Sequence, residues 1–173
     1  MLTRSLERSD VREGFSCGEP SLDRFLERYA WQNQRRHHLG ITYVTVDDAT
    51  RRVLGYFTLA AASLRSDESQ VRVPGGYAEI PAIRVSRLAV DRRVQGIGLG
   101  SELVRAALTI ARAESERVGC AGVIVDALSG AEGFYARFGF QPLGVRAGAG
   151  AVRPRPTLMW LGMGEIERAG ERE

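Results

Sequence analysis

Apolar side chains recur at helical spacing near the start of the chain, over residues 19 to 35. The repeat follows positions i, i+3, i+4 and i+7, so these side chains share one face of a helix and are expected to be buried. Pro20 and Ser21 are typical of the first turn of a helix. The residues of this stripe are Leu22, Phe25, Leu26 and Tyr29.

Runs rich in β-branched and aromatic residues follow at positions 41–46 and 53–64, with a short polar turn between them. This pattern predicts a β-hairpin. Residues 65–80 are polar and contain Pro74-Gly75-Gly76, which predicts a surface loop before a third strand at 83–90.

The second half of the chain alternates helix and strand patterns. Apolar residues at helical spacing extend from Leu99 to about residue 118, and a wholly apolar run at 122–125 predicts a buried strand. Ser129 and Glu132 match a capping box, which opens a short helix that ends at Gly139. A last strand is expected at 157–161, whereas residues 144–156 show no periodicity.

This order of elements predicts an α/β (α+β) fold, with a mixed, mostly antiparallel sheet and helices on both faces. The 173 residues, 44% hydrophobic and 26% charged, are expected to form a single domain over residues 1–164 with a polar tail at 165–173. No apolar run resembles a signal peptide or a membrane span, so a cytoplasmic protein is expected. Two isolated cysteines predict neither a disulfide framework nor a metal site.

The charged residues suggest phosphate chemistry only weakly. All 24 basic side chains are arginine, and the net charge of +3 is too small to identify a nucleic-acid partner. Coding bias explains the absence of lysine simply, although arginine also suits bidentate contacts with phosphate. Without lysine, a Walker A loop is excluded.

A glycine-rich loop, Gln95-Gly96-Ile97-Gly98-Leu99-Gly100, lies between the third strand and the long helix. Glycines let the backbone turn sharply, and the amides at the start of a helix form an anion site. A dinucleotide-binding G-x-G-x-x-G motif would need glycine where Ser101 stands. A tight turn that binds no ligand is the competing interpretation.

Together with the preceding Arg87-Leu88-Ala89-Val90-Asp91, this loop resembles the central motif of the GNAT acetyltransferase superfamily. The resemblance implies the GNAT fold and acetyl-coenzyme A as cofactor. It assigns the pyrophosphate to the loop amides and the pantetheine arm to the end of the strand. The cofactor-binding residues implied are Leu88, Ala89, Val90, Gln95, Gly96, Ile97, Gly98, Leu99, Gly100 and Ser101.

Phe134-Tyr135 followed by Gly139-Phe140 resembles a second GNAT landmark. The resemblance implies that Tyr135 is catalytic and protonates the departing thiolate, which suits a phenol in a site that excludes water. Taken alone, the spacing fits a core aromatic equally well. No general base stands out, although an α-amine that titrates near pH 8 is already largely neutral and reacts without one.

The segment Phe15-Ser16-Cys17-Gly18-Glu19-Pro20 and the motifs above resemble the GNAT toxins of bacterial toxin–antitoxin pairs. The resemblance implies acetylation of the α-amine of aminoacyl-tRNA, which blocks translation, together with neutralisation by a ribbon-helix-helix antitoxin and formation of a homodimer. Arginines are candidates for contacts with tRNA phosphates. They are Arg35, Arg36, Arg92 and Arg93, and also Arg146, Arg153 and Arg155.

Two other functions remain open. A GNAT enzyme that acetylates a small molecule or a protein amine would be expected to cluster acidic residues around a cationic substrate, and the sequence shows no such cluster. A non-catalytic GNAT-like binding module would be expected to lack the tyrosine or a loop glycine, and both are present.

Overall fold

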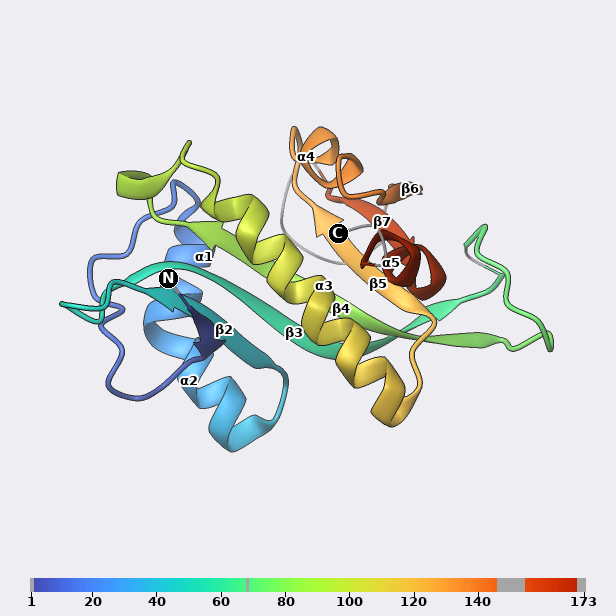
Figure 1. The fold of residues 1–173 in the computed structure, drawn as a ribbon, viewed down its shortest axis with the longest axis horizontal. Helices are drawn as coiled ribbons and strands as arrows, with labels where there is room; N and C mark the ends of the chain where they lie inside the picture. Colours follow the sequence, from blue (N-terminus) through green and yellow to red (C-terminus); the bar gives the residue numbers. More distant parts are fainter. Residues whose placement is uncertain (1, 68, 146–154, 171–173) are drawn as a thin grey trace. The chain divides into compact units, whose positions relative to one another are not determined.

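The computed structural model describes residues 2–67, 69–145 and 155–170. Figure 1 shows the ribbon with its helices and strands labelled. The chain divides into two compact units, a first unit of residues 1–60 and 85–107 and a second unit of residues 61–84 and 108–173. The strands are β1 Thr3–Ser5, β2 Ile41–Val46, β3 Val53–Arg65, β4 Glu79–Val90, β5 Gly122–Ala127, β6 Gln141–Val145 and β7 Thr157–Gly162. The α-helices are α1 Pro20–Arg24, α2 Ala30–Gln32, α3 Leu99–Val118, α4 Glu132–Ala136 and α5 Met163–Gly170.

Strands and helices follow the sequence prediction closely. The strand order is β1-β2-β3-β4-β5-β7-β6, and β1 pairs with β2, β2 with β3, β5 with β7, and β6 with β7, all antiparallel. Strand β4 begins four residues before the predicted start at residue 83, and β1 and β6 lack any pattern that would have predicted them.

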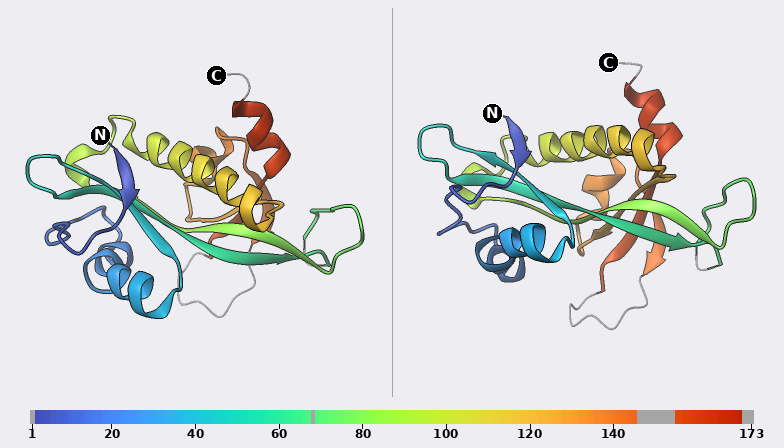
Figure 2. Two further views of the ribbon diagram at one scale, coloured as in Figure 1. Left: turned by 60° about the horizontal axis from the view of Figure 1, so that its bottom comes forward. Right: turned by 90° about the horizontal axis from the view of Figure 1, so that it is seen from below.

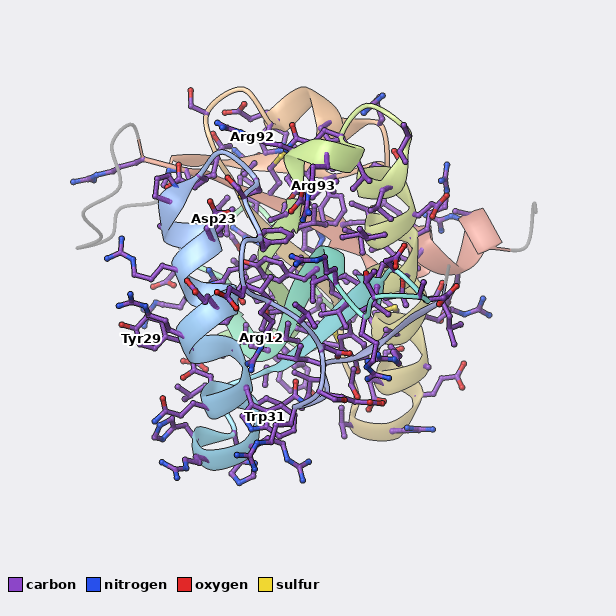
Figure 3. All side chains as sticks on the ribbon, turned by 90° about the vertical axis from the view of Figure 1, so that its left-hand side faces the viewer. Arg12, Asp23, Tyr29, Trp31, Arg92 and Arg93 are labelled. Atoms are coloured by element: carbon purple, nitrogen blue, oxygen red, sulfur yellow. The ribbon has the colours of Figure 1, made fainter. Side chains whose placement is uncertain are left out.

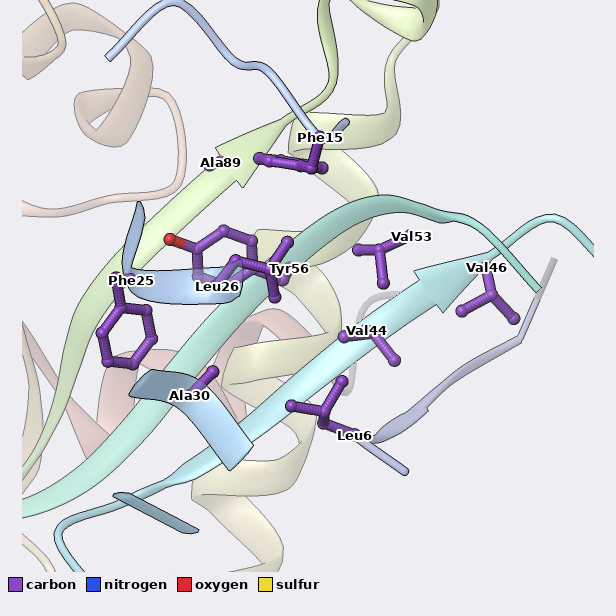
Figure 4. Packing of buried hydrophobic residues seen from close by; sticks show 10 residues of the cluster. All are labelled: Leu6, Phe15, Phe25, Leu26, Ala30, Val44, Val46, Val53, Tyr56 and Ala89. Carbon is purple, nitrogen blue, oxygen red and sulfur yellow. The ribbon is translucent and has the colours of Figure 1, made fainter. Parts of the chain in front are cut away.

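In the first unit, helices cover both faces of the sheet, as predicted (Figure 2). Gly55 and Tyr56 are neighbours in β3 and therefore point to opposite faces. A Cβ atom on Gly55 would lie 2.9 Å from Cδ1 of Leu103, so α3 packs closely on that face. Tyr56 is fully buried on the other face in a cluster that includes Phe25 and Leu26 from the helical segment 20–37 (Figure 4).

The predicted burial of Tyr29 is wrong, because the helical segment 20–37 contains two π-helical turns. These are η1, Phe25–Tyr29, and η2, Asn33–His37. In η1 the amide of Ala30 donates to the carbonyl of Phe25, five residues earlier. The wider turn shifts the buried stripe to Ala30 and Gln34 and leaves Tyr29 47% exposed.

The second unit is built on the antiparallel pair β5 and β7. Residues Val123 to Val125 are almost completely buried, which confirms the predicted apolar strand. Gly122 is required by close packing, because an added Cβ atom would lie 2.5 Å from the carbonyl oxygen of Leu161. Helix α5 includes residues 165–170, which were predicted as a polar tail, and it buries Met163 and Ile166.

The predicted capping box at the start of α4 is not formed. The cap is Ala131 rather than Ser129, and it makes no side-chain cap hydrogen bond. The carboxylate of Glu132 instead accepts hydrogen bonds from the amide of Gly130 at 2.9 Å and from the hydroxyl of Thr157 at 3.1 Å. The start of α4 is therefore tied to β7 rather than to its own first turn.

Across residues 2–67, 69–145 and 155–170, none of the helices combines the length and apolar character that a membrane crossing requires. Within the same residues, no three His, Cys, Asp or Glu side chains are grouped so that they could hold a metal ion.

Candidate active site

The glycine-rich loop has open space beside two of its glycines. Gly96 and Gly98 adopt φ angles of +80° and +96°, in the left-handed region that favours glycine. A Cβ atom added at either position would meet no other atom within 4 Å. The protein itself therefore leaves this space open, and the residues present suit a bound group such as a pyrophosphate.

Helix α3 begins immediately after these glycines. The amides of Ser101 and Glu102 donate to the carbonyl of Gly98 at 2.9 and 3.2 Å, which closes the first turn. Among the described residues, none accepts a hydrogen bond from the amides of residues 97–100. These donors lie at the positive end of a twenty-residue helix, where an anion is stabilised.

Asp91 lies directly before the loop and is 1% exposed. Its carboxylate accepts hydrogen bonds from Nε and Nη2 of Arg93, both at 2.8 Å, and from the amides of Arg93 and Ser16. The Arg93 hydrogen bond lowers the pKa of Asp91 to about 2, against the opposing effect of its burial. A permanent charge at this position therefore holds the short 3-10 turn η3, Arg92–Val94, that leads into the loop.

The side chain of Gln95, at the start of the glycine-rich loop, makes two hydrogen bonds to the backbone. Its side-chain Nε2 donates to the carbonyl oxygens of Cys17 and Val90, each at 2.9 Å. The resemblance assigned Gln95 to the cofactor, but its side-chain amide nitrogen is occupied by these two contacts within the protein. The side chain supports the shape of the loop, and a contact with the cofactor would have to come from other atoms of the residue.

The strand residues assigned to the pantetheine arm differ in burial. Ala89 is buried in the core of the first unit, whereas Leu88 and Val90 are half-buried. The amide of Asp91, immediately after Val90, donates to the carbonyl of Leu54 at 2.8 Å.

Tyr135 belongs to the second unit and lies among aromatic rings. Its ring centroid is 5.2 Å from that of Phe134 and 5.8 Å from that of Phe140, both in edge-to-face geometry. Burial raises the pKa of the Tyr135 phenol to about 12. Among the described residues its hydroxyl has no hydrogen-bond partner. The phenol therefore keeps its proton at neutral pH.

Four of the seven candidate tRNA-binding arginines form two separate pairs, Arg35 with Arg36 and Arg92 with Arg93. All four side chains are exposed, and Arg35 stacks over the ring of Trp31 at 5.6 Å. In Figure 3, Trp31 lies toward one end of the view, and Arg92 and Arg93 lie toward the other. Arg146 and Arg153 lie outside the described residues.

Arg92 and Arg93 have different surroundings. The guanidinium of Arg92 lies against Gly18, where an added Cβ atom would be 3.0 Å from Nη2. Arg93 is bound by Asp91 through its side chain, so it also supports the loop. Sequence reasoning missed this role of Asp91. The only available signal was an acidic residue directly before a pair of arginines.

A model of the acetyltransferase (GNAT) domain matches residues 38–142, which is more than half of the chain. The chain belongs to the GNAT acetyltransferase family. The matched residues of this GNAT acetyltransferase include the glycine-rich loop, the long helix and Tyr135.

Among curated proteins, a tRNA-acetylating toxin of Mycobacterium tuberculosis is 36% identical over 140 residues, which cover 80% of this chain and 82% of the relative. Among solved structures, AtaT complexed with acetyl-methionyl-tRNAfMet is 27% identical, with a TM-score of 0.81 and coverage of 98% of both chains. A tyrosine-to-phenylalanine mutant of AtaT bound to the C-terminus of the antitoxin AtaR and acetyl-CoA is 28% identical, with a TM-score of 0.77 and coverage of 98% and 97%.

These findings confirm the predicted family, fold class and enzyme class of this GNAT acetyltransferase. The individual cofactor-binding and catalytic residues, and the extent of the domain over residues 1–164, stay predictions.

Proposed function

We propose that this GNAT acetyltransferase is a toxin that uses acetyl-coenzyme A to acetylate the α-amine of aminoacyl-tRNA and so blocks translation. The observation that carries the proposal is the 36% identity, over 80% of the chain, to a tRNA-acetylating toxin. A small-molecule amine or a protein amine is the alternative substrate for the same chemistry.

The glycine-rich loop supplies the cofactor site in this proposal. The amides of residues 97–100 have no acceptor among the described residues, and space is open beside Gly96 and Gly98, so a pyrophosphate would be bound by these amides. The strand residues Leu88, Ala89 and Val90 would hold the pantetheine arm. When bound, acetyl-coenzyme A supplies the acetyl group as a thioester.

Tyr135 is the proposed acid. Because burial raises the pKa of its phenol to about 12, the phenol remains protonated while the amine substrate is neutral. Its proton would pass to the sulfur atom as the bond between carbon and sulfur breaks, and the phenolate would regain a proton from water.

No side chain is needed to remove the proton of the amine. An α-amine titrates at about 7.7–8.0 in peptides, and the ester-linked amine of an aminoacyl-tRNA titrates lower. Such an amine is mostly neutral near pH 7.5, so water can take its proton after attack. His37 and His38 are exposed at the end of η2, which suits a solvated helix end rather than a base.

The tRNA body would be bound through phosphates. Arg35, Arg36 and Arg92 are exposed and are candidates for these contacts, whereas Arg93 is engaged by Asp91. A ribbon-helix-helix antitoxin, a homodimer and a cytoplasmic location complete the proposal. They are supported by the resemblance to toxin–antitoxin pairs and, for an antitoxin of unspecified type, by the structure of AtaT with AtaR.

The decisive experiment treats a mixture of charged tRNAs with the purified protein and acetyl-coenzyme A. Mass spectrometry of the released amino acids should then find an N-acetyl group on at least one of them. The rate should fall steeply between 50 and 200 mM salt, conditions that weaken phosphate contacts. Arg92→Glu should lower transfer to tRNA more than cofactor binding. Acetylation of a small amine, with no acetyl group on any tRNA-linked amino acid, would support the alternative substrate instead.

A further inference from the structure

Arg87 of β4 holds a positive charge against an aromatic ring inside the first unit. Its guanidinium carbon lies 3.8 Å from the centroid of the Phe25 ring. Because residues two apart in a strand face the same side, Arg87 shares its face with Ala89, which packs in the core with Phe25 and Tyr56. The cation is therefore held on the face that the helical segment 20–37 covers.

Arg87 has no anionic partner among the described residues. It forms no ion pair or hydrogen bond with them, in contrast to Arg84, which pairs with Asp126, and to Arg93, which pairs with Asp91. The carboxylate of Asp23, in the same region, accepts a hydrogen bond from the Cys17 amide at 2.8 Å.

The hydroxyl of Tyr56 is occupied as well, since it donates to the carbonyl of Leu22 at 2.9 Å. Among the described residues, neither Asp23 nor Tyr56 forms a hydrogen bond or an ion pair with the Arg87 guanidinium.

An unpaired, half-buried cation costs free energy of folding. Burial lowers the pKa of Arg87, which shows that its surroundings disfavour the charge, although a guanidinium remains protonated in proteins. The nitrogen atoms are nevertheless not sealed off. Among the described residues, the only buried side-chain nitrogen or oxygen atoms without a partner are Nε of Arg51 and Oγ of Ser69. The guanidinium nitrogen atoms of Arg87 are therefore in part open to solvent.

The stacking on Phe25 also sets the direction of the donors. All five N–H bonds of a guanidinium lie in its plane, and a distance of 3.8 Å between its carbon and the ring centroid fits a ring packed against its flat face, which leaves the edges for a planar, bidentate contact. This geometry suits a phosphate or a carboxylate.

We propose that Arg87 is a substrate-binding residue that contacts a backbone phosphate near the aminoacylated 3′ end of tRNA. The inference rests on the proposed function, because it assumes that aminoacyl-tRNA is the substrate. The pyrophosphate of the cofactor is already assigned to the amides of residues 97–100, beyond the end of the strand. The absence of an anionic partner within the described residues is thus explained by a substrate that brings its own anion.

The test compares the wild-type protein with Arg87→Met, which keeps an unbranched side chain against Phe25 but removes the charge. With charged tRNA the KM should rise about 10- to 100-fold, the scale of a lost hydrogen-bonded contact to a charged group. The affinity for acetyl-coenzyme A should stay the same. Acetylation of methionine methyl ester, an ester-linked amine without phosphate, should stay the same too. The slope of log affinity for tRNA against log salt concentration should become less steep by about 1, the change expected when one phosphate contact is lost.

Thermal denaturation separates ligand binding from a structural role. Removal of an unpaired, half-buried charge should leave the melting temperature unchanged or raise it. Arg117→Met, at an exposed arginine that pairs with Glu114, is the matched control and should change none of these quantities. Arg87→Lys keeps the charge without the planar fork and should give an intermediate KM.

Each contrary result has its own meaning. A lower melting temperature with equal losses on tRNA and on the ester would overturn the inference and make Arg87 structural. Weaker binding of acetyl-coenzyme A would overturn it in favour of a cofactor contact. If the wild-type protein acetylates the ester but no charged tRNA, the proposed function itself fails, whatever the variant does.

Discussion

The glycine-rich loop and the helix that carries Tyr135 belong to different units, and they are stabilised by different interactions. The loop is stabilised by polar contacts. The Asp91 carboxylate accepts a hydrogen bond from Arg93, and the Gln95 side-chain amide donates to the backbone of Cys17. Helix α4 places Tyr135 among aromatic rings, where burial raises the pKa of its phenol. In the proposed function the loop presents bare amides to an anion, whereas Tyr135 acts as an acid and must keep its proton. Polar support serves the first need and an apolar environment serves the second.

The largest effect is expected from Gly98→Asp, which tests the loop directly. The new side chain would enter the open space beside the loop with a negative charge, and it would strain a backbone at φ +96°. Calorimetry should show binding of acetyl-coenzyme A weakened about 100-fold or more, because like charges repel strongly at a helix start.

Gly119→Asp is the matched control for this prediction. Gly119 also has a positive φ, +75°, and open space, but it follows the opposite end of α3. Both variants should lose some stability through backbone strain, and only Gly98→Asp should lose cofactor binding. Equal cofactor binding by the two variants would remove the loop from the site.

Tyr135→Phe should have the next largest effect. Loss of the hydroxyl keeps the aromatic packing, so cofactor binding and melting temperature should be nearly unchanged while turnover falls by about 100-fold. Tyr77→Phe, at an exposed tyrosine of the second unit, is the control and should keep full turnover. A fully active Tyr135→Phe enzyme would make Tyr135 a core aromatic only.

The pH dependence of the wild-type rate also tests whether Tyr135 is the acid. The phenol is protonated below its pKa of about 12, so it should cause no loss of rate on the alkaline side up to about pH 10. The rate should rise with pH only as the substrate amine loses its proton. A fall in rate between pH 8 and pH 10 in a protein that remains folded would contradict this assignment.

A smaller effect is expected from Asp91→Asn, which tests the support under the loop. Its side chain loses charge-assisted hydrogen bonds to Arg93, so the free energy of unfolding at pH 7 should fall by about 1–3 kcal/mol. Cofactor binding should weaken several-fold rather than disappear, because the glycines and the amides remain. Arg93→Met should have a similar effect, and the double variant should lose little more than either single variant.

The ion pair of Asp91 and Arg93 is expected to make a contribution to stability that is lost in acid. The folded-state pKa of Asp91 is about 2, below its ordinary value of 3.8, so its contribution is present above pH 4 and is lost as the pH falls toward 2. Chemical denaturation at pH 4 and at lower pH should show that Asp91→Asn has lost this part of the pH dependence. An unchanged dependence would show that Asp91 is not held as the structure indicates.

The sequence by itself determined the elements whose signals are local. The strand at 41–46 and the helix from Leu99 to Val118 have the predicted bounds, because side-chain alternation and helical spacing report burial within a single element. The glycines of the loop and the aromatic residues around Tyr135 were recognised for the same reason. Each of these motifs is defined by residues only a few positions apart in the sequence.

Only the tertiary structure decided which polar side chains have partners. Asp91 and Gln95 are bound to Ser16 and Cys17, which lie 75 and 78 positions away in sequence, and no local pattern predicts such contacts. The π-helical turns that expose Tyr29 break the regular helical spacing, and no local sequence pattern indicated them. The unpaired state of Arg87 is decided in the same way, since a charge is compensated or left uncompensated by residues that folding brings near it.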